Sequence, residues 1–425
     1  KFLRNHHLML TPHLQRSPDG ELLCENVRLT DVARQFGTPA YVYSRATIVD
    51  NFRAYQRAFA ASKPLICYAV KANSTLSVLA LLAAEGAGFD IVSAGELQRV
   101  IAAGGEAGKV IFSGVAKRHD EIALALAHNI FCFNIESEAE LHRVNEVAQA
   151  HGKRARITFR INPDVDAKTH PYISTGLKSN KFGVAHADAV RLYTLAASMP
   201  GIEVHGIECH IGSQITELSP YVDALRRLLS LVDDLSARGI HLQHLDIGGG
   251  RAINYQGESL VPMDEFAHAV EREIAGRHLD LLIEPGRSIV GDAGLLLTRV
   301  EFLKPGETKN FALVDAAMND LIRPTLYDAF HPVAPVLERT GEAVLYDIVG
   351  PVCESGDWLA KARQLVLSQG DLLAVLCAGA YGMTMASNYN TRSRPCEVLI
   401  DRDEAHLIRE RERFEDLIAH ERIVI

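Results

Sequence analysis

The sequence lacks several features that would place the chain in other protein classes. No apolar run reaches the roughly 20 residues of a membrane-spanning helix. The N-terminal residues do not show the basic, apolar and small-residue succession of a secretion signal. The net charge of −9 at pH 7 argues against a broad contact surface for nucleic acid. We therefore expect a soluble protein that acts on small molecules and binds neither membranes nor nucleic acid.

Cysteine is present, but the seven residues form no framework. They are odd in number, scattered, and contain no C-x-x-C pair. This pattern predicts neither a disulfide scaffold nor a metal site, and it is typical of proteins from a reducing cytoplasm. No internal repeat and no low-complexity segment is present. We expect a cytoplasmic protein without a bound metal.

The first two thirds of the chain alternate between buried strand patterns and amphipathic helix patterns. Helical segments include 94–103, 137–150 and 221–238. The strand candidates are eight in number and comprise residues 65–70, 88–92, 110–113, 130–135, 155–161, 204–210, 244–247 and 281–284. Eight strand-then-helix units predict an α/β fold of the (β/α)8 barrel type. An open, doubly wound parallel sheet has the same periodicity and stays open as the alternative.

The pattern changes after residue 284. Short strand candidates separated by glycine, proline and aspartate follow at residues 295–303, 311–314, 344–349, 372–376 and 396–400. Such spacing predicts a second, mainly β domain, a sandwich or barrel. Residues 8–24 also have a strand-like pattern and are expected to join it. The predicted division is therefore an N-terminal segment of the β domain (1–45), the barrel (46–289) and the C-terminal β domain (290–425).

Polar residues stand at the ends of most predicted barrel strands, where barrel enzymes gather their catalytic groups. Lys71 ends the first strand, before a helix expected to start at Ser74 and to stop at Gly86. The other strands end near Asp90, Ser113, Asn134, Asn162, His210, residues 248–250 and Glu284. A lysine at such a place commonly reaches out to solvent. A buried lysine, however, has a lowered pKa and can form a Schiff base.

Three motifs point to a phosphorylated cofactor. "DIGGGR" (246–251) and "EPGR" (284–287) follow the seventh and eighth strands, where barrels commonly bind phosphate, and glycines let backbone N–H groups approach an anion. "HIGSQ" (210–214) offers His210 for stacking on a flat ring and Ser213 for a phosphate oxygen. Taken singly, the glycine motif "DIGGGR" is equally typical of a flexible turn, and a lone histidine such as His210 is more often a structural residue. Together with Lys71 and the Glu284 carboxylate they suggest pyridoxal phosphate.

A fourth motif lies in the β domain. In "GPVCESGD" (350–357), Cys353 is surrounded by glycine, proline and charged residues. We expect an exposed loop, in which a thiol serves chemistry more often than packing.

These motifs resemble those of the diaminopimelate decarboxylases, within the alanine-racemase-like (fold type III) pyridoxal-phosphate enzymes. The resemblance runs through most of the chain, and its most specific parts are "STGLKSNKFG", "RPTLYDA" and "AYGMTMASNYN". It implies decarboxylation of meso-2,6-diaminopimelate at its D-centre to L-lysine and CO2, the final step of lysine biosynthesis.

The resemblance also implies roles for single residues. Lys71 is expected to bind the cofactor covalently, with Asp90 orienting it or its neighbours, His210 to stack on the pyridine ring and Glu284 to face the ring nitrogen. The phosphate is expected to be surrounded by Ser213, Gly249, Gly250, Gly286 and Tyr381, with Arg287 at its edge.

The substrate is expected to meet residues of both domains. Its distal carboxylate is expected to bind Arg287, Arg323 and Tyr327, and its distal ammonium Glu354; Tyr381 is also expected to contact substrate. Cys353 is the expected proton donor. The resemblance implies that Cys353 and Glu354 come from the partner subunit of a homodimer.

Two other functions remain open from the sequence. An ornithine or arginine decarboxylase of the same fold would share the barrel motifs, but two arginines favour a substrate with a distal carboxylate. A non-catalytic pyridoxal-phosphate carrier or regulator would not need Lys71, Cys353 and a full second domain together.

Overall fold

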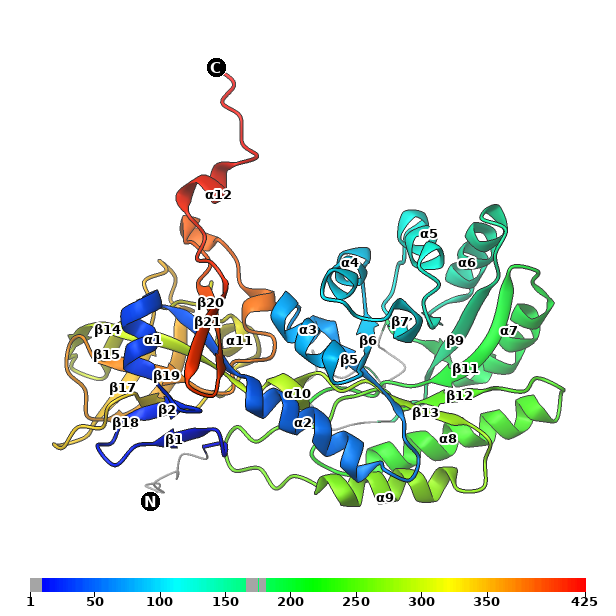
Figure 1. Cartoon of the computed structure of the whole chain (residues 1–425), viewed down its shortest axis with the longest axis horizontal. Helices are drawn as coiled ribbons and strands as arrows, with labels where there is room; N and C mark the ends of the chain where they lie inside the picture. The colour runs from blue at the N-terminus through cyan, green and yellow to red at the C-terminus, as the bar shows by residue number, and fades with distance from the viewer. Residues whose placement is uncertain (1–9, 166–174, 176–180) are drawn as a thin grey trace. The chain divides into compact units, whose positions relative to one another are not determined.

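The computed structural model describes residues 10–165, 175 and 181–425. They form two compact units (Figure 1). The barrel unit contains residues 51–253 and 259–288, and the β unit contains residues 1–50, 254–258 and 289–425. Most of the motif "STGLKSNKFG" lies outside the described residues. The domain limits expected at residues 45 and 289 stay a prediction.

The barrel unit is a closed ring of eight parallel strands. They are β5 (Leu65–Ala69), β6 (Gly88–Ile91), β7 (Val110–Phe112), β8 (Cys132–Ile135), β9 (Ala155–Asn162), β11 (Ile202–Glu208), β12 (His244–Asp246) and β13 (Asp280–Ile283). The pairing of β13 with β5 and of β8 with β9 closes the ring, and the short strand β10 (Val184–Ala185) pairs with β9. The predicted (β/α)8 barrel is confirmed, and the open sheet is excluded.

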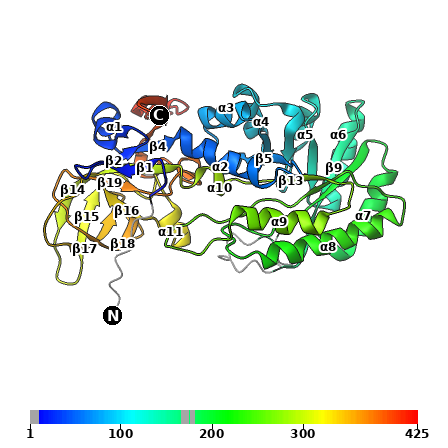
Figure 2. The ribbon, with the colours of Figure 1, turned by 60° about the horizontal axis from the view of Figure 1, so that its bottom comes forward.

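Helices surround this ring. They are α3 (Leu76–Ala84), α4 (Ala94–Ala102), α5 (His119–Ala127), α6 (Glu138–Ala150), α7 (His186–Ser198), α8 (Ser219–Ser236) and α9 (Met263–Ile274). The helix α2 (Arg45–Ala58) and the single turn α10 (Arg287–Val290) each contain residues of both units. Figures 1 and 2 show α8 and α9 side by side on its outer face. On α8, Leu225, Leu228, Leu229 and Val232 are buried, which is the spacing of one helix face.

The helix after β5 begins one residue later than expected. Its N-cap residue is Thr75, so the prediction of Ser74 is wrong by one position. The Asn73 side chain accepts a hydrogen bond from Thr75 N at 3.1 Å, and this local turn carries the chain past Ser74. Gly86 follows the helix with φ +88°, as expected for a left-handed helix end. Residues 70–72 between β5 and this turn form a short 3₁₀ helix, η1 (Val70–Ala72).

The β unit contains a large sheet with the order β18-β17-β15-β14-β4-β20-β21, to which β19 and β16 are added. The strands are β4 (Ala40–Ser44), β14 (Gly294–Lys304), β15 (Asn310–Val314), β16 (Val333–Pro335), β17 (Val344–Val349), β18 (Trp358–Leu365), β19 (Leu372–Val375), β20 (Cys396–Asp401) and β21 (Glu404–Arg409). The helical elements of this unit are α1 (Leu29–Phe36), α11 (Arg323–Tyr327), α12 (Phe414–Ile418), η4 (Met383–Met385) and η5 (Tyr389–Thr391). The predicted mainly β domain is confirmed.

Both ends of the chain build the β unit, though through a different strand from the one expected. Residues 14–28 form a separate small sheet from β1 (Leu14–Arg16), β2 (Leu22–Cys24) and β3 (Val27–Arg28). The strand that enters the large sheet is β4, which pairs with β14 and β20. Leu22, Leu29 and Val42 share one buried cluster with Leu295 and Val398, so the two chain ends are held by a common core.

Candidate active site

Lys71 lies in η1, directly after β5, at the end of the strand where it was expected. Its Nζ is 2.6 Å from Oδ2 of Asp90, at the end of the neighbouring strand β6. The Lys71 side chain is 35% exposed, whereas that of Asp90 is fully buried. Asp90 Oδ1 has no hydrogen-bond partner among the described residues. The carboxylate thus holds a reachable amine at the barrel mouth, consistent with the orienting role expected for Asp90.

Glu284 follows β13 and is buried. Asn134 Nδ2 donates to Glu284 Oε1 at 3.4 Å and to Ser113 Oγ at 3.1 Å. Burial, together with the nearby Asp246, Asp90 and Glu208 carboxylates, raises the pKa of Glu284 well above its usual value, while Lys71 acts in the opposite direction. Burial also raises the pKa of Asp246 to about 7. This end of the barrel gathers more carboxylates than cations, so a positively charged group is favoured there.

The glycines of "DIGGGR" allow very close packing of the strand-end loops. A Cβ on Gly249 would lie 2.0 Å from the Glu284 carbonyl oxygen, and a Cβ on Gly250 would lie 2.1 Å from that of Gly212. Gly250 also has φ +96°, a conformation that favours glycine. Because no side chain fits here, backbone groups line the end of the barrel after β12 and β13.

His210 lies two residues beyond β11 rather than within it as expected. Its Nδ1 accepts a hydrogen bond from Gly249 N at 3.2 Å, so the proton of the neutral ring is on Nε2. Burial lowers the pKa of His210 well below its usual value, and the positive charges of Arg160 and Lys71 lower it further. The ring is therefore neutral, which suits stacking on a flat aromatic group.

Ser213 and Arg287 are joined in the same unit. The Arg287 guanidinium donates to Ser213 Oγ from Nε at 3.3 Å and from Nη2 at 3.1 Å. Gly286, the residue before Arg287, packs against the end of β5 and against η1: a Cβ on Gly286 would lie 3.0 Å from the Ala69 Cβ and 3.1 Å from the Ala72 Cβ. The loops after β5, β11 and β13 are thereby brought to one place, which carries Lys71, Ser213 and Arg287.

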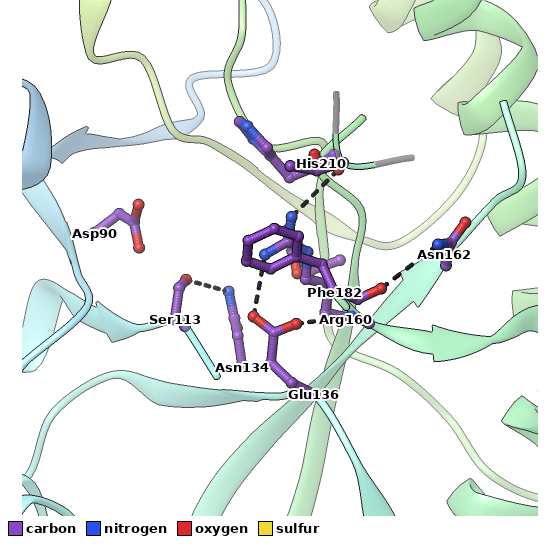
Figure 3. A network of polar contacts seen from close by, with 12 residues as sticks. Asp90, Ser113, Asn134, Glu136, Arg160, Asn162, Phe182 and His210 are labelled. Carbon is purple, nitrogen blue, oxygen red and sulfur yellow. Dashed lines mark hydrogen bonds and ion pairs between the residues drawn. The ribbon is translucent and has the colours of Figure 1, made fainter. Parts of the chain in front are cut away.

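Sequence reasoning missed a buried polar network at the same end of the barrel (Figure 3). Arg160 in β9 donates to Glu136 Oε1 at 3.0 Å and to the His210 carbonyl oxygen at 3.3 Å. Its guanidinium lies 4.8 Å from the centre of the Phe182 ring, and Glu136 Oε2 accepts from Gly183 N at 2.7 Å. The network ties the His210 backbone to β8 and β9. No sequence signal set Arg160 apart, since β9 also carries Arg156, Thr158 and Asn162 among its apolar residues.

The other predicted site residues belong to the β unit. Arg323 begins the short helix α11 and is buried, and Tyr327 ends that helix half-buried. Tyr381 is half-buried and has φ +56°, which is uncommon for a bulky residue and typical of functional sites when it occurs.

Cys353 and Glu354 are exposed on a loop with a fixed base, as expected for "GPVCESGD". The buried Asp357 carboxylate accepts a hydrogen bond from Met318 N and one from Val352 N, each at 2.7 Å. Cys353 N donates to Asn390 Oδ1 at 3.1 Å. The loop therefore presents a thiol and a carboxylate to solvent on a firmly bonded backbone.

Comparison with known proteins gives consistent matches over most of the chain. Residues 45–291 match the family described as pyridoxal-dependent decarboxylase, pyridoxal binding domain. The chain is 56% identical to the diaminopimelate decarboxylase of Vibrio cholerae over 96% of this chain and 98% of that protein. It is 54% identical to the diaminopimelate decarboxylase of Pseudomonas aeruginosa, again over 96% of this chain and 98% of that protein.

Solved structures agree with these sequence matches. Diaminopimelate decarboxylase from Helicobacter pylori, complexed with L-lysine, has a TM-score of 0.89 and 42% identity, covering 92% of this chain and 98% of that one. The enzyme from M. jannaschii, also in complex with L-lysine, has a TM-score of 0.93 and 36% identity, covering 98% and 99%. A lysine/ornithine decarboxylase from Vibrio vulnificus is more distant, with a TM-score of 0.78 and 26% identity, covering 88% of this chain and 97% of that one.

Proposed function

The chain belongs to the diaminopimelate decarboxylase family of pyridoxal-dependent decarboxylases, and we propose that the residues described above form its active site. The protein is a carboxy-lyase that uses pyridoxal phosphate to convert meso-2,6-diaminopimelate into L-lysine and CO2, the last step of lysine biosynthesis. The position of Lys71 beside a buried carboxylate cluster is the structural observation that carries the site assignment.

The barrel residues fit pyridoxal phosphate in three respects. Lys71 supplies a reachable amine for covalent attachment. Glu284 and its neighbouring carboxylates favour a protonated ring nitrogen, and the neutral His210 ring suits stacking. The glycine-lined end at Gly249, Gly250 and Gly286, with Ser213 and Arg287, offers backbone and side-chain donors to a phosphate. When bound, the cofactor supplies an electron sink for the electrons released as CO2 leaves.

Gly249→Ala is expected to weaken cofactor binding about tenfold or more, because the new Cβ must displace the Glu284 backbone. We also expect about 1–3 kcal/mol of destabilisation from overpacking. Titration of the apo protein with pyridoxal phosphate, followed by absorbance, measures the first effect, and thermal unfolding measures the second. Gly108→Ala is the control, since a Cβ there meets nothing within 4 Å. Unchanged cofactor affinity in Gly249→Ala would remove this glycine from the phosphate site.

We propose that Arg287, Arg323 and Tyr327 bind the distal carboxylate and that Glu354 binds the distal ammonium, with Tyr381 near the phosphate and the substrate. Two guanidinium groups match a carboxylate and repel the distal cation of ornithine or arginine. This charge pattern favours meso-diaminopimelate over those substrates. The decisive assay is release of CO2 and formation of L-lysine from meso-diaminopimelate, with ornithine as the comparison substrate.

Arg323→Ala is expected to lower kcat/KM for meso-diaminopimelate by roughly 30- to 1000-fold, the effect of losing about 2–4 kcal/mol of charge-assisted binding. Cofactor absorbance should not change. Steady-state kinetics and an absorption spectrum test both statements. Arg339→Ala is a matched control in the same unit, because Arg339 is exposed and forms a surface ion pair with Asp371. An Arg323→Ala enzyme with normal kcat/KM would show that another group reads the distal carboxylate.

We propose that Cys353 delivers a proton to the carbon that loses CO2, and that it acts in the partner subunit of a homodimer together with Glu354. The exposed position of the thiol, on a loop whose backbone is hydrogen-bonded at Cys353 N, supports this role. A donor fixed on one face of the carbon would set the configuration of the product.

We also propose a cytoplasmic location. All seven cysteines are free thiols in the structure, which suits a reducing compartment. No helix among the described residues is long and apolar enough to span a membrane.

A further inference from the structure

We propose that His331 and Tyr255 are positioning residues that hold the Arg323 guanidinium in the orientation required by the substrate's distal carboxylate. This inference rests on the role proposed above for Arg323. All three residues belong to the β unit and are buried, with exposed fractions of 0% for His331, 6% for Arg323 and 8% for Tyr255.

The contacts converge on one nitrogen of the guanidinium. Arg323 Nη1 lies 3.0 Å from the Tyr255 hydroxyl and 2.9 Å from His331 Nε2. The guanidinium carbon also lies 5.2 Å from the centre of the Tyr255 ring, and the Tyr255 and His331 rings meet edge to face at 83°. A planar group held through one nitrogen and one face keeps little rotational freedom.

The protonation state of His331 follows from its two partners. Arginine only donates hydrogen bonds, so Nε2 accepts from Arg323. His331 Nδ1 is 2.9 Å from the Leu376 carbonyl oxygen, which only accepts, so Nδ1 carries the proton. His331 is therefore neutral and fixed in one tautomer by the backbone after β19. Tyr255 and His331 are both uncharged, so these two contacts orient the guanidinium without cancelling its charge.

Tyr255 is itself held by a self-bonded segment, residues 254–258. Glu258 Oε2 accepts from Tyr255 N and from Gln256 N, each at 2.7 Å. Asn254 Oδ1 accepts from Gly257 N at 2.6 Å, and its Nδ2 donates to the Glu258 carbonyl oxygen at 3.0 Å. These bonds fix the place of the Tyr255 hydroxyl beside Arg323 Nη1, so the guanidinium is held in one orientation for the charge-assisted hydrogen bonds that a carboxylate accepts.

The test uses the holoenzyme with three variants. Tyr255→Phe removes one oxygen, His331→Phe removes the acceptor, and His331→Gln keeps an acceptor near Nε2. We expect Tyr255→Phe and His331→Phe to raise KM for meso-diaminopimelate about 5- to 50-fold with kcat within about twofold, because the distal carboxylate takes no part in the bond that breaks. His331→Gln should recover most of the loss. Tyr346→Phe is the matched control, since Tyr346 belongs to the same unit and is also 8% exposed.

Binding of two ligands tests the carboxylate directly. The variants should weaken the binding of L-lysine, which retains the carboxylate, and should leave the binding of cadaverine, which lacks it, unchanged. In an Arg323→Ala background, His331→Phe should cause no further loss, since neighbours that act through one group are not additive. The absorbance of the bound cofactor and the melting temperature check that each variant is folded. If His331→Phe does not fold, Tyr255→Phe alone tests the inference.

Two results would overturn the inference, and they differ. The positioning role is wrong, and the proposed function stands, if Arg323→Ala weakens the binding of L-lysine but Tyr255→Phe and His331→Phe do not. The same conclusion follows if His331→Phe raises KM as much in the Arg323→Ala background as in the unmodified enzyme. If Arg323→Ala itself leaves both KM and L-lysine binding unchanged, the proposed role of Arg323 is wrong and the positioning role falls with it.

Discussion

An enzyme in which alanine replaces Lys71 is expected to lose the visible absorbance of bound pyridoxal phosphate and at least about 10³-fold in turnover. The amine lies at the barrel mouth, 2.6 Å from Asp90 and near the Glu284 cluster, and in the described structure no other lysine is paired with a carboxylate of that cluster. An absorption spectrum of the purified protein with added cofactor, followed by a CO2-release assay, measures both effects.

Lys109→Ala is a closely matched control for this experiment. Lys109 also lies at an end of a barrel strand, immediately before β7, and its side chain is 34% exposed against 35% for Lys71. Its removal breaks only a surface pair with Glu106 and should leave spectrum and turnover unchanged. If Lys71→Ala keeps its colour and borohydride fixes the cofactor to a different lysine, the assignment of Lys71 fails.

Mixing two inactive variants is expected to restore activity if active sites are shared between subunits. Homodimers of Lys71→Ala and of Cys353→Ala should each be nearly inactive. After random subunit exchange about half the dimers are mixed, and each mixed dimer has one site with both changes and one site with neither. Activity should therefore return to roughly a quarter of the unmodified enzyme. The assay needs equal amounts of the two variants and mass spectrometry to verify exchange.

The control mixture pairs Lys71→Ala with Glu284→Gln. Both residues belong to the barrel unit of one subunit, so each site in a mixed dimer carries one change and no activity should return. If activity returns in the mixture with Cys353→Ala but not in the mixture with Glu284→Gln, Cys353 contributes to the active site of the partner subunit. If subunit exchange is verified and the first mixture recovers no activity, Cys353 either acts within its own subunit or takes no part in the reaction.

The barrel could be predicted because its strands are buried on both faces and end in polar or glycine-rich segments. The run 65–70 and the strand β5 (Leu65–Ala69) differ by a single residue, and the Lys71 position follows from that boundary. β4 escaped prediction because "AYVYS" is buried throughout and lies between two helices, where it resembles a short connector. Its pairing with β14 depends on residues about 250 positions away in the sequence, and local sequence patterns cannot predict pairing over that separation.

The same limit applies to the candidate site. Glycines and single charged residues at strand ends predicted the places of Lys71 and Gly249, because barrel geometry brings all strand ends together. The contact between Arg323 and Tyr255 joins residues 68 positions apart through a segment that the sequence assigns to the barrel. Neither periodicity nor a motif predicts such a contact.

The pairing of β4 constrains the order in which the protein can fold during synthesis. Ala40 pairs with Leu297 in β14 and with Cys396 in β20, so both neighbours of β4 are made long after it. At 5–20 residues per second, β4 waits roughly 10–50 s for β14. Within that interval every strand of the barrel ring emerges, since β5 to β13 lie between the two. The barrel can therefore close first, while an apolar β4 remains unpaired on the ribosome, where it is a natural target for chaperones and for misassembly between neighbouring nascent chains.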